Sequence, residues 1–182
     1  MRVYAATPLS QWRDLHAWMK KNGRGDSWMK PGLLKGFVDG SLGSHTAAME
    51  EPYTDAPKDR GLMVTNEFEL YDWVSGADKA GMQIAVHAIG DRANHMLLDT
   101  YERVAKENGA RDRRFRVEHA QHLRPQDIPR FAALGVVASM QPYHAIDDGR
   151  WATKTIGPER AKTSYAFRSL LDAKAHLAFG SD

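Results

Sequence analysis

His87, His119 and Asp182 each stand at the end of a short apolar run of the sequence. Imidazole nitrogens and carboxylate oxygens bind divalent metal ions, and both groups can also transfer protons. A single residue of this kind more commonly has a structural role, because buried histidines are often held by a hydrogen bond and aspartates often cap helices. Three of them in equivalent positions instead indicate a shared site. We therefore predict that all three bind one divalent metal and that Asp182 also acts as the catalytic base.

The apolar runs before these residues have the composition of buried strands. Residues 83–87 contain small and β-branched side chains without polar alternation, which is typical of a strand buried on both faces. A helix should follow, with Asp91 as its N-cap, apolar residues at helical spacing and Gly109 at its end. The same order of strand and helix recurs, and it predicts six strands near residues 2–8, 33–39, 83–87, 115–119, 136–142 and 177–182.

Strands that alternate with helices, with no neighbouring pair that could form a hairpin, predict an α/β fold with a parallel sheet and right-handed crossovers. A doubly wound sheet and a TIM barrel both fit this order. Functional side chains at nearly every strand end favour the barrel, because a doubly wound sheet gathers its site at one switch point. Neighbouring parallel strands lie about 5 Å apart, so His87 and His119 should converge within reach of one ion. In a barrel, Asp182 would face the same mouth.

The segment from Gly40 to Met63 has no hydrophobic periodicity and is rich in Gly, Ser, Pro and Asp. Loops of this length in a compact domain commonly cover or line a binding site, so we expect a lid over the metal site. Thr65 should cap the helix that follows this loop. Phe68, Tyr71 and Val74 should form the buried face of that helix.

Lys35 lies inside an otherwise apolar strand. On residue type alone, a lysine at a sheet edge whose amine reaches water is the simpler interpretation. The alternative is a buried lysine, whose pKa falls on desolvation so that the neutral amine can react with carbon dioxide to give a carbamate. A carbamate is an anionic oxygen ligand that suits a metal ion.

The composition limits the class of protein. With 182 residues, 42% of them hydrophobic, the chain is long enough for one core, and we expect a single domain over residues 1–182. The net charge is +2 and the basic residues are scattered, which argues against nucleic acid as a partner. No cysteine is present, so a metal must have nitrogen and oxygen ligands. No apolar run is long enough to span a membrane, so we expect a cytoplasmic protein without a membrane partner.

Five runs of the sequence resemble the amidohydrolase superfamily, and within it the YtcJ-like metal-dependent hydrolases, the branch that includes N-substituted formamide deformylase. These runs occur in order through nearly the whole chain, as Leu34–Ser44, Val86–Ala93, Arg116–Gln121, Ser139–His144 and Phe179–Asp182. The resemblance implies a (β/α)8 barrel that holds one or two divalent metal ions, with zinc expected. It places the superfamily's often carboxylated lysine on Lys35, its histidine ligands on His87 and His119, and its aspartate on Asp182.

By the same resemblance, the chain corresponds to about strands 3 to 8 of that barrel. The HxH pair that ends strand 1 in the superfamily is absent from this sequence, as are strand 2 and the flanking β-sandwich. We therefore expect an incomplete barrel with part of its metal ligands. The outer strands, near residues 3–6 and 177–179, carry little charge. The chain expressed alone should therefore aggregate or form homo-oligomers, and it should lack hydrolase activity.

The expected function is that of a metal-dependent hydrolase that cleaves the C–N bond of a small amide-type substrate other than a peptide. His144 and Gln141, at the end of the fifth predicted strand, are expected to bind this substrate, and a water-exposed loop position is about as common for His144. The alternatives are an esterase or lactonase of the same superfamily, an inactive or complementation-dependent fragment, and a metal-free barrel that binds a sugar or another small molecule. Metal analysis separates the last of these from the hydrolase.

Overall fold

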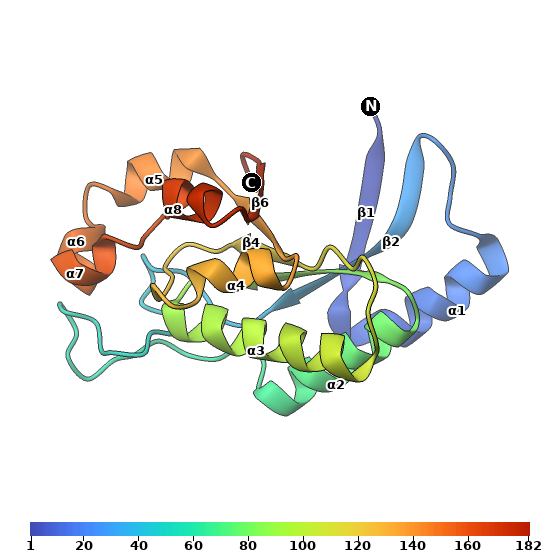
Figure 1. Ribbon diagram of the computed structural model, residues 1–182, viewed down its shortest axis with the longest axis horizontal. Coiled ribbons are helices and arrows are strands. Elements are labelled where there is room, and N and C mark those ends of the chain that lie inside the picture. The colour runs from blue at the N-terminus through green and yellow to red at the C-terminus, as the bar shows by residue number, and fades with distance from the viewer.

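Six parallel strands form one sheet in the computed structural model, which describes residues 1–182 (Figure 1). The strands pair in chain order, so each lies beside the strands that precede and follow it in the sequence. Their bounds are β1 Val3–Pro8, β2 Met29–Phe37, β3 Gln83–Ala88, β4 Arg116–His119, β5 Val137–Met140 and β6 His176–Phe179. The sequence prediction of a parallel α/β sheet is therefore confirmed.

Helices connect the strands, and α2 and α3 lie side by side beneath the sheet in Figure 1. Because the strand order never reverses, crossovers of one hand place the connecting helices on one face of the sheet. A doubly wound sheet requires such a reversal, so that alternative is excluded. The helices are η1 Leu9–Gln11, α1 Trp12–Asn22, α2 Glu67–Lys79, α3 Asp91–Glu107, α4 Ile128–Ala133, α5 Pro142–Asp148, α6 Ala152–Ile156, α7 Pro158–Ala161 and α8 Phe167–Asp172.

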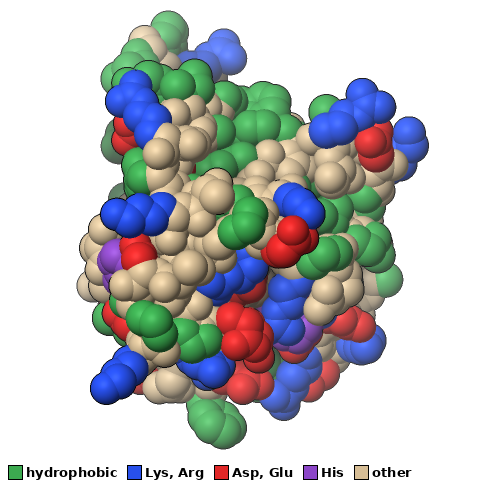
Figure 2. All heavy atoms as spheres, turned by 90° about the vertical axis from the view of Figure 1, so that its left-hand side faces the viewer, with side chains coloured by type: hydrophobic (Ala, Val, Ile, Leu, Met, Phe, Trp, Pro, Cys, Tyr) green, Lys and Arg blue, Asp and Glu red, His purple; other side chains and the backbone are tan.

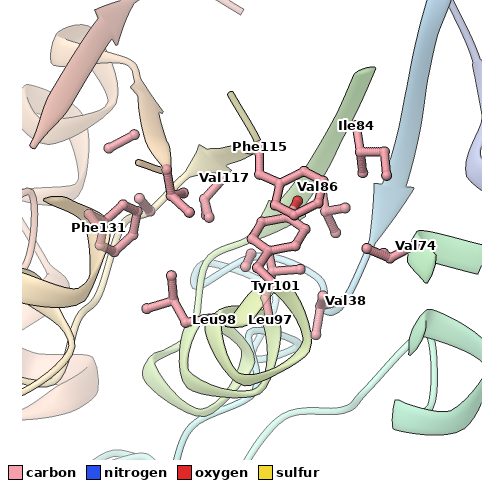
Figure 3. Close-up of a cluster of buried hydrophobic side chains, with 14 of the residues drawn as sticks. Val38, Val74, Ile84, Val86, Leu97, Leu98, Tyr101, Phe115, Val117 and Phe131 are labelled. Atoms are coloured by element: carbon pink, nitrogen blue, oxygen red, sulfur yellow. The ribbon is translucent and has the colours of Figure 1, made fainter. Parts of the chain in front are cut away.

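The helix-facing side of the sheet forms the hydrophobic core (Figure 3). Side chains of a strand alternate between its two faces, and Val86 and Val117 point to this side and are fully buried. Tyr101 of α3 is buried with them, stacks on the ring of Phe115 with centroids 4.3 Å apart, and donates its hydroxyl to the carbonyl of Arg116 at 2.9 Å. Burying each large apolar side chain contributes about 1.5–3 kcal/mol, so this layer fixes the position of the strands.

The opposite side of the sheet is polar. Lys35 and Phe37 of β2 face this side together because they are two residues apart, and the Lys35 amine lies 3.9 Å from the centroid of the Phe37 ring. His87 of β3 pairs in register with Phe37 and with Glu118 of β4. Glu118 accepts from the guanidinium of Arg116 at 2.7 Å. Lys35 and His87, two of the side chains predicted to form the site, thus share one face of the sheet.

The N-terminal cap of α2 differs from the prediction by one residue. Asn66, and not Thr65, is the N-cap, because its side chain accepts from the backbone N–H of Glu69 at 3.0 Å. The Glu69 carboxylate accepts from the Asn66 amide in return, at 2.7 Å. Thr65 instead donates its hydroxyl to the carbonyl of Phe37 at 2.6 Å, which fastens the end of the preceding loop to β2.

The buried face of α2 also differs from the prediction. Val74 is fully buried as predicted, but Phe68 is 86% exposed, and Leu70 and Ala77 are buried with Val74 instead. Both sets recur at helical spacing, so the sequence allowed either face. Packing of α2 on α3 selects the second set, and Tyr71 lies at the boundary, where its hydroxyl donates to Glu107 of α3. The helix after β3, in contrast to α2, begins one residue earlier than predicted, with Gly90 and not Asp91 as its N-cap.

The two edge strands are partly open to solvent. Val3 and Tyr4 of β1 are 40% and 45% exposed, and Phe179 of β6 is 59% exposed.

On the surface, Lys and Arg side chains lie among Asp and Glu side chains on the face drawn in Figure 2. Among the ion pairs of the protein, Arg130 pairs with Asp99 at 2.6 Å. None of the helices combines the length and the apolar character needed to cross a membrane.

Candidate metal centre

The carboxyl ends of β3 and β4 bring His87 and His119 together. Their rings lie edge to face, with centroids 4.6 Å apart. His87 is held from the loop after β2, since its Nε2 atom lies 2.8 Å from the carbonyl oxygen of Gly40 and 3.4 Å from the Asp39 carboxylate. The convergence of the two imidazoles follows from the parallel pairing of β3 with β4.

Asp39 anchors the loop that carries these contacts. Its carboxylate is buried and accepts from the backbone N–H groups of Ala48 at 2.8 Å, Ile89 at 3.0 Å and Gly90 at 2.8 Å. These bonds tie the loop after β2 to the turn between β3 and α3. Asp39 was not among the predicted site residues, although it ends the apolar run 33–39 and so carries the same sequence signal as His87 and Asp182.

His119 ends β4 at an abrupt turn. Its φ of 76° and the φ of 45° at Ala120 both lie in the left-handed region, which non-glycine residues rarely adopt. The Nδ1 atom of His119 lies 2.8 Å from the amide oxygen of Gln141. That oxygen can only accept, so Nδ1 carries the proton and the lone pair of Nε2 is free for another partner. Burial, with a smaller effect from His87, lowers the pKa of His119 and favours the neutral ring that a metal requires.

The free nitrogen of His119 faces Asp182 and His144. The His119 Nε2 atom lies 3.9 Å from Asp182 Oδ2, and the ring of His119 stacks on that of His144 with centroids 6.1 Å apart. Ligand atoms of His119, His144 and Asp182 all lie within 4.8 Å of one another. His87, which the sequence also assigned to the metal, is beside this group and not part of it.

Lys35 points into the same cavity from β2. β2 lies between β1 and β3, so the interpretation as an edge lysine is wrong. Burial lowers the pKa of the Lys35 amine, and the nearby carboxylates of Glu118 and Asp182 oppose this shift. A lysine in this position has the environment that the carbamate hypothesis requires.

A cavity of about 780 Å³ connects these groups. Lys35, His87, His119, His144 and Asp182 all line it. The start of the long loop, residues 41–43, forms part of its wall, as expected for a loop that borders a binding site. Gln141 is 5% exposed and does not line the cavity, so it contacts His119 on the side of the ring that faces away from the cavity.

Other wall residues gave no signal in the sequence. Asp148, Trp151 and Tyr165 line the cavity from segments to which the sequence analysis gave no role, and Gln121, the last residue of the run Arg116–Gln121, lines it with them. Their loops and short helices lack strong periodicity, so only the tertiary structure places them. The donor set as a whole consists of imidazole nitrogens and carboxylate oxygens, with one histidine held neutral, and it fits a divalent metal ion such as zinc.

Comparison with known proteins agrees with this geometry. The sequence model of the amidohydrolase family matches residues 3–182. The chain belongs to the amidohydrolase family. It is 50% identical over 177 residues to the protein LONG AFTER FAR-RED 3 of Arabidopsis thaliana, with 96% of this chain and 30% of that protein covered.

Two bacterial proteins of related description are also similar to this amidohydrolase chain. It is 36% identical over 151 residues to the putative amidohydrolase YtcJ of Bacillus subtilis, which covers 83% of this chain and 28% of YtcJ. It is 28% identical over 155 residues to the N-substituted formamide deformylase of Arthrobacter pascens, which covers 85% of this chain and 28% of that enzyme.

A solved structure extends the comparison to three dimensions. The crystal structure of an uncharacterized metal-dependent hydrolase from Pyrococcus furiosus superposes with a TM-score of 0.86 at 34% identity, over 100% of this chain and 37% of the other. The chain thus spans roughly a third of the length of its relatives, 30% in the case of the Arabidopsis protein.

Proposed function

We propose that this chain contributes the active site of a metal-dependent amidohydrolase that cleaves the C–N bond of a small amide-type substrate other than a peptide. The observation that carries the proposal is the approach of His119, His144 and Asp182 ligand atoms to within 4.8 Å of one another in a cavity that also contains Lys35 and His87. The names of the bacterial relatives, an amidohydrolase and a formamide deformylase, support the C–N bond.

We propose that residues 1–182 form one domain, and that its six strands correspond to strands 3 to 8 of a (β/α)8 barrel. The chain-order pairing of the strands supports this assignment, because a barrel is built from the same repeated step. The superposition on the Pyrococcus hydrolase over the full chain at a TM-score of 0.86 supports it as well.

We assign His119 and Asp182 as metal ligands, and His144 as a third ligand because its ligand atom lies close to theirs. His87 and Lys35, which line the same cavity, are the further ligands that the family resemblance implies. Zinc suits this nitrogen and oxygen set, as one ion or two, and a carboxylated Lys35 would add an anionic oxygen. A bound divalent ion would polarise the scissile carbonyl group and lower the pKa of the attacking water.

The chain's own residues perform the proton transfers in this proposal. Asp182 is 59% exposed on its side chain and its Oδ2 atom faces His119, so it can reach both water and substrate. It accepts a proton from water as the water oxygen bonds to the carbonyl carbon, and it returns that proton to the nitrogen as the C–N bond breaks. Gln141 keeps the Nδ1 proton of His119 in place throughout, since it offers that proton an acceptor.

Metal analysis and hydrolysis assays of the full natural protein test the proposal. We expect a divalent metal in fixed ratio to protein, and its loss when His119→Ala and Asp182→Ala are combined. His176→Ala, at an exposed position at the start of β6, is the control and should retain the metal.

The bond type needs a separate comparison. N-substituted formamides should be cleaved faster than esters with the same acyl group. Faster cleavage of the ester or of a lactone would reassign the protein to the esterase alternative. A metal-free protein that binds a sugar or other small molecule without cleaving it would reject the hydrolase.

A further inference from the structure

One wall of the cavity is lined by aromatic rings and carboxylates. The lining residues between positions 143 and 165 include the aromatic rings of Tyr143, Trp151 and Tyr165 and the carboxylates of Asp147 and Asp148. No lysine or arginine lines this wall. Aromatic faces beside a carboxylate attract cations, because the ring quadrupole and the negative charge act in the same direction. This wall therefore differs from the part of the cavity that Lys35 lines.

Asp148 is the carboxylate that the protein holds in place. Its Oδ2 atom accepts from the side-chain amide of Gln121 at 2.6 Å and from the hydroxyl of Tyr165 at 2.6 Å. No protein group donates to its Oδ1 atom, which leaves one acceptor for a ligand. Asp147 differs, because it is exposed and lies 3.7 Å from Arg150 in a surface ion pair.

The two donors to Asp148 are themselves fixed. Gln121 is 4% exposed, and its carbonyl accepts from the backbone N–H of Tyr165 at 2.7 Å. Tyr165 has a φ of 49°, in the left-handed region. An L-residue in that region carries a backbone cost of about 1–3 kcal/mol, which persists only where the surrounding structure imposes it. Here the strained backbone directs the phenol onto Asp148.

We infer that Asp148 recognises a cationic ammonium or amidinium group of the substrate, with its Oδ1 atom as acceptor, in a cavity that the rings of Trp151 and Tyr165 also line. This deepens the proposed function and rests on it, since the cationic group would lie in the same cavity as the scissile bond. The substrate class is then a small amide that carries a positive charge away from the bond that is cleaved.

Binding of probes that have no cleavable bond to the full natural protein, with its metal in place, tests this inference without any catalysis. The probes are benzylammonium and benzyl alcohol, which have similar shapes and differ in charge, and calorimetry measures their affinities. We expect benzylammonium to bind at least about tenfold more tightly. Asp148→Asn should abolish that preference, and Asp147→Asn, the matched loss of a neighbouring charge, should change it by less than about threefold.

Two outcomes would overturn the inference: equal binding of the two probes, or a preference that Asp148→Asn leaves intact. An equal effect of Asp147→Asn would do so too, because net charge alone would then explain the result. If Asp148→Asn does not fold, the Tyr165→Phe variant provides the test. Loss of one donor to Asp148 Oδ2 should weaken the preference for benzylammonium by about threefold. An unchanged preference in this variant would contradict the inference. Metal content and hydrolysis are measured separately, so a failed hydrolase assay with an intact cation preference rejects only the proposed function.

Discussion

The Nδ1 atom of His119 lies 2.8 Å from the amide oxygen of Gln141. This contact links the end of β4 to the residue that follows β5, on the next strand of the sheet. It orients the ring so that Nε2 faces Asp182, at 3.9 Å from Oδ2. The sequence predicted that Gln141 binds substrate, and in the structure Gln141 does not line the cavity and contacts His119 instead.

Replacing Gln141 with leucine should weaken metal binding by about 10- to 100-fold, because an outer-shell acceptor fixes the tautomer and orientation of the histidine ligand. Competition with a chelator measures the affinity. Gln126→Leu, at an exposed glutamine before α4, is the control and should leave the affinity unchanged. Equal affinities for Gln141→Leu and the natural protein would show that His119 is oriented by other contacts.

Asp39→Asn should destabilise the fold by about 2–4 kcal/mol. The carboxylate accepts from three backbone N–H groups, and the asparagine amide can only offer one acceptor while its NH₂ group faces donors. Urea unfolding measures the change. Asp59→Asn is the matched control, since Asp59 lies exposed in the same loop and its carboxylate accepts only from the backbone N–H of Gly61, at 2.8 Å. A loss of equal size in both variants would contradict the anchoring role of Asp39.

Gly90→Ala should impair folding severely. A Cβ atom at Gly90 would lie 2.0 Å from the carbonyl oxygen of Ala48, a backbone atom that cannot move without displacing the loop that Asp39 anchors. Gly180→Ala, where an added Cβ meets nothing within 4 Å, is the control and should retain stability. Thermal melting compares the two. A Gly90→Ala protein with an unchanged melting temperature would mean that the loop can move away at little cost.

Stability should decrease as the pH falls from about 6.5 to about 3 because of His122. Burial, together with the charge of Arg160, lowers the pKa of His122 to about 3. The unfolded chain, with a histidine pKa near 6.5, therefore binds a proton in this range that the folded chain does not bind. The contribution is fully present above pH 6.5 and is lost as the pH falls, by up to about 1.4 kcal/mol per pH unit.

The variant His122→Asn isolates this contribution. In the natural protein, the His122 Nδ1 atom lies 2.7 Å from the hydroxyl oxygen of Ser164, and the His122 Nε2 atom lies 3.5 Å from the side-chain amide nitrogen of Gln121. Neither of these neighbouring groups titrates. The difference in unfolding free energy between the natural protein and the variant, measured by urea at several pH values, should decrease from pH 7 to pH 4. A difference that does not depend on pH would show that His122 is protonated in the folded state.

The positions of the strands in the chain and their parallel arrangement could be predicted from the sequence alone. Runs such as residues 83–87 are apolar over their whole length, and this local property marks a buried parallel strand without reference to the rest of the chain. Since parallel strands end at one edge, the approach of His87 to His119 followed from the same pattern. The face of α2 did not follow, because Phe68 and Leu70 both lie on apolar stripes and only packing against α3 distinguishes them.

The tertiary structure alone decided which side chains of the site contact one another. His144 approaches Asp182 although 38 positions separate them, and Asp148 meets Gln121 and Tyr165 through loops without periodic sequence. Such contacts depend on backbone dihedral angles that residue type specifies weakly, such as the left-handed conformations of His119 and Tyr165. Local patterns therefore placed the candidate metal ligands at the ends of strands, while the packing of distant segments determined their partners.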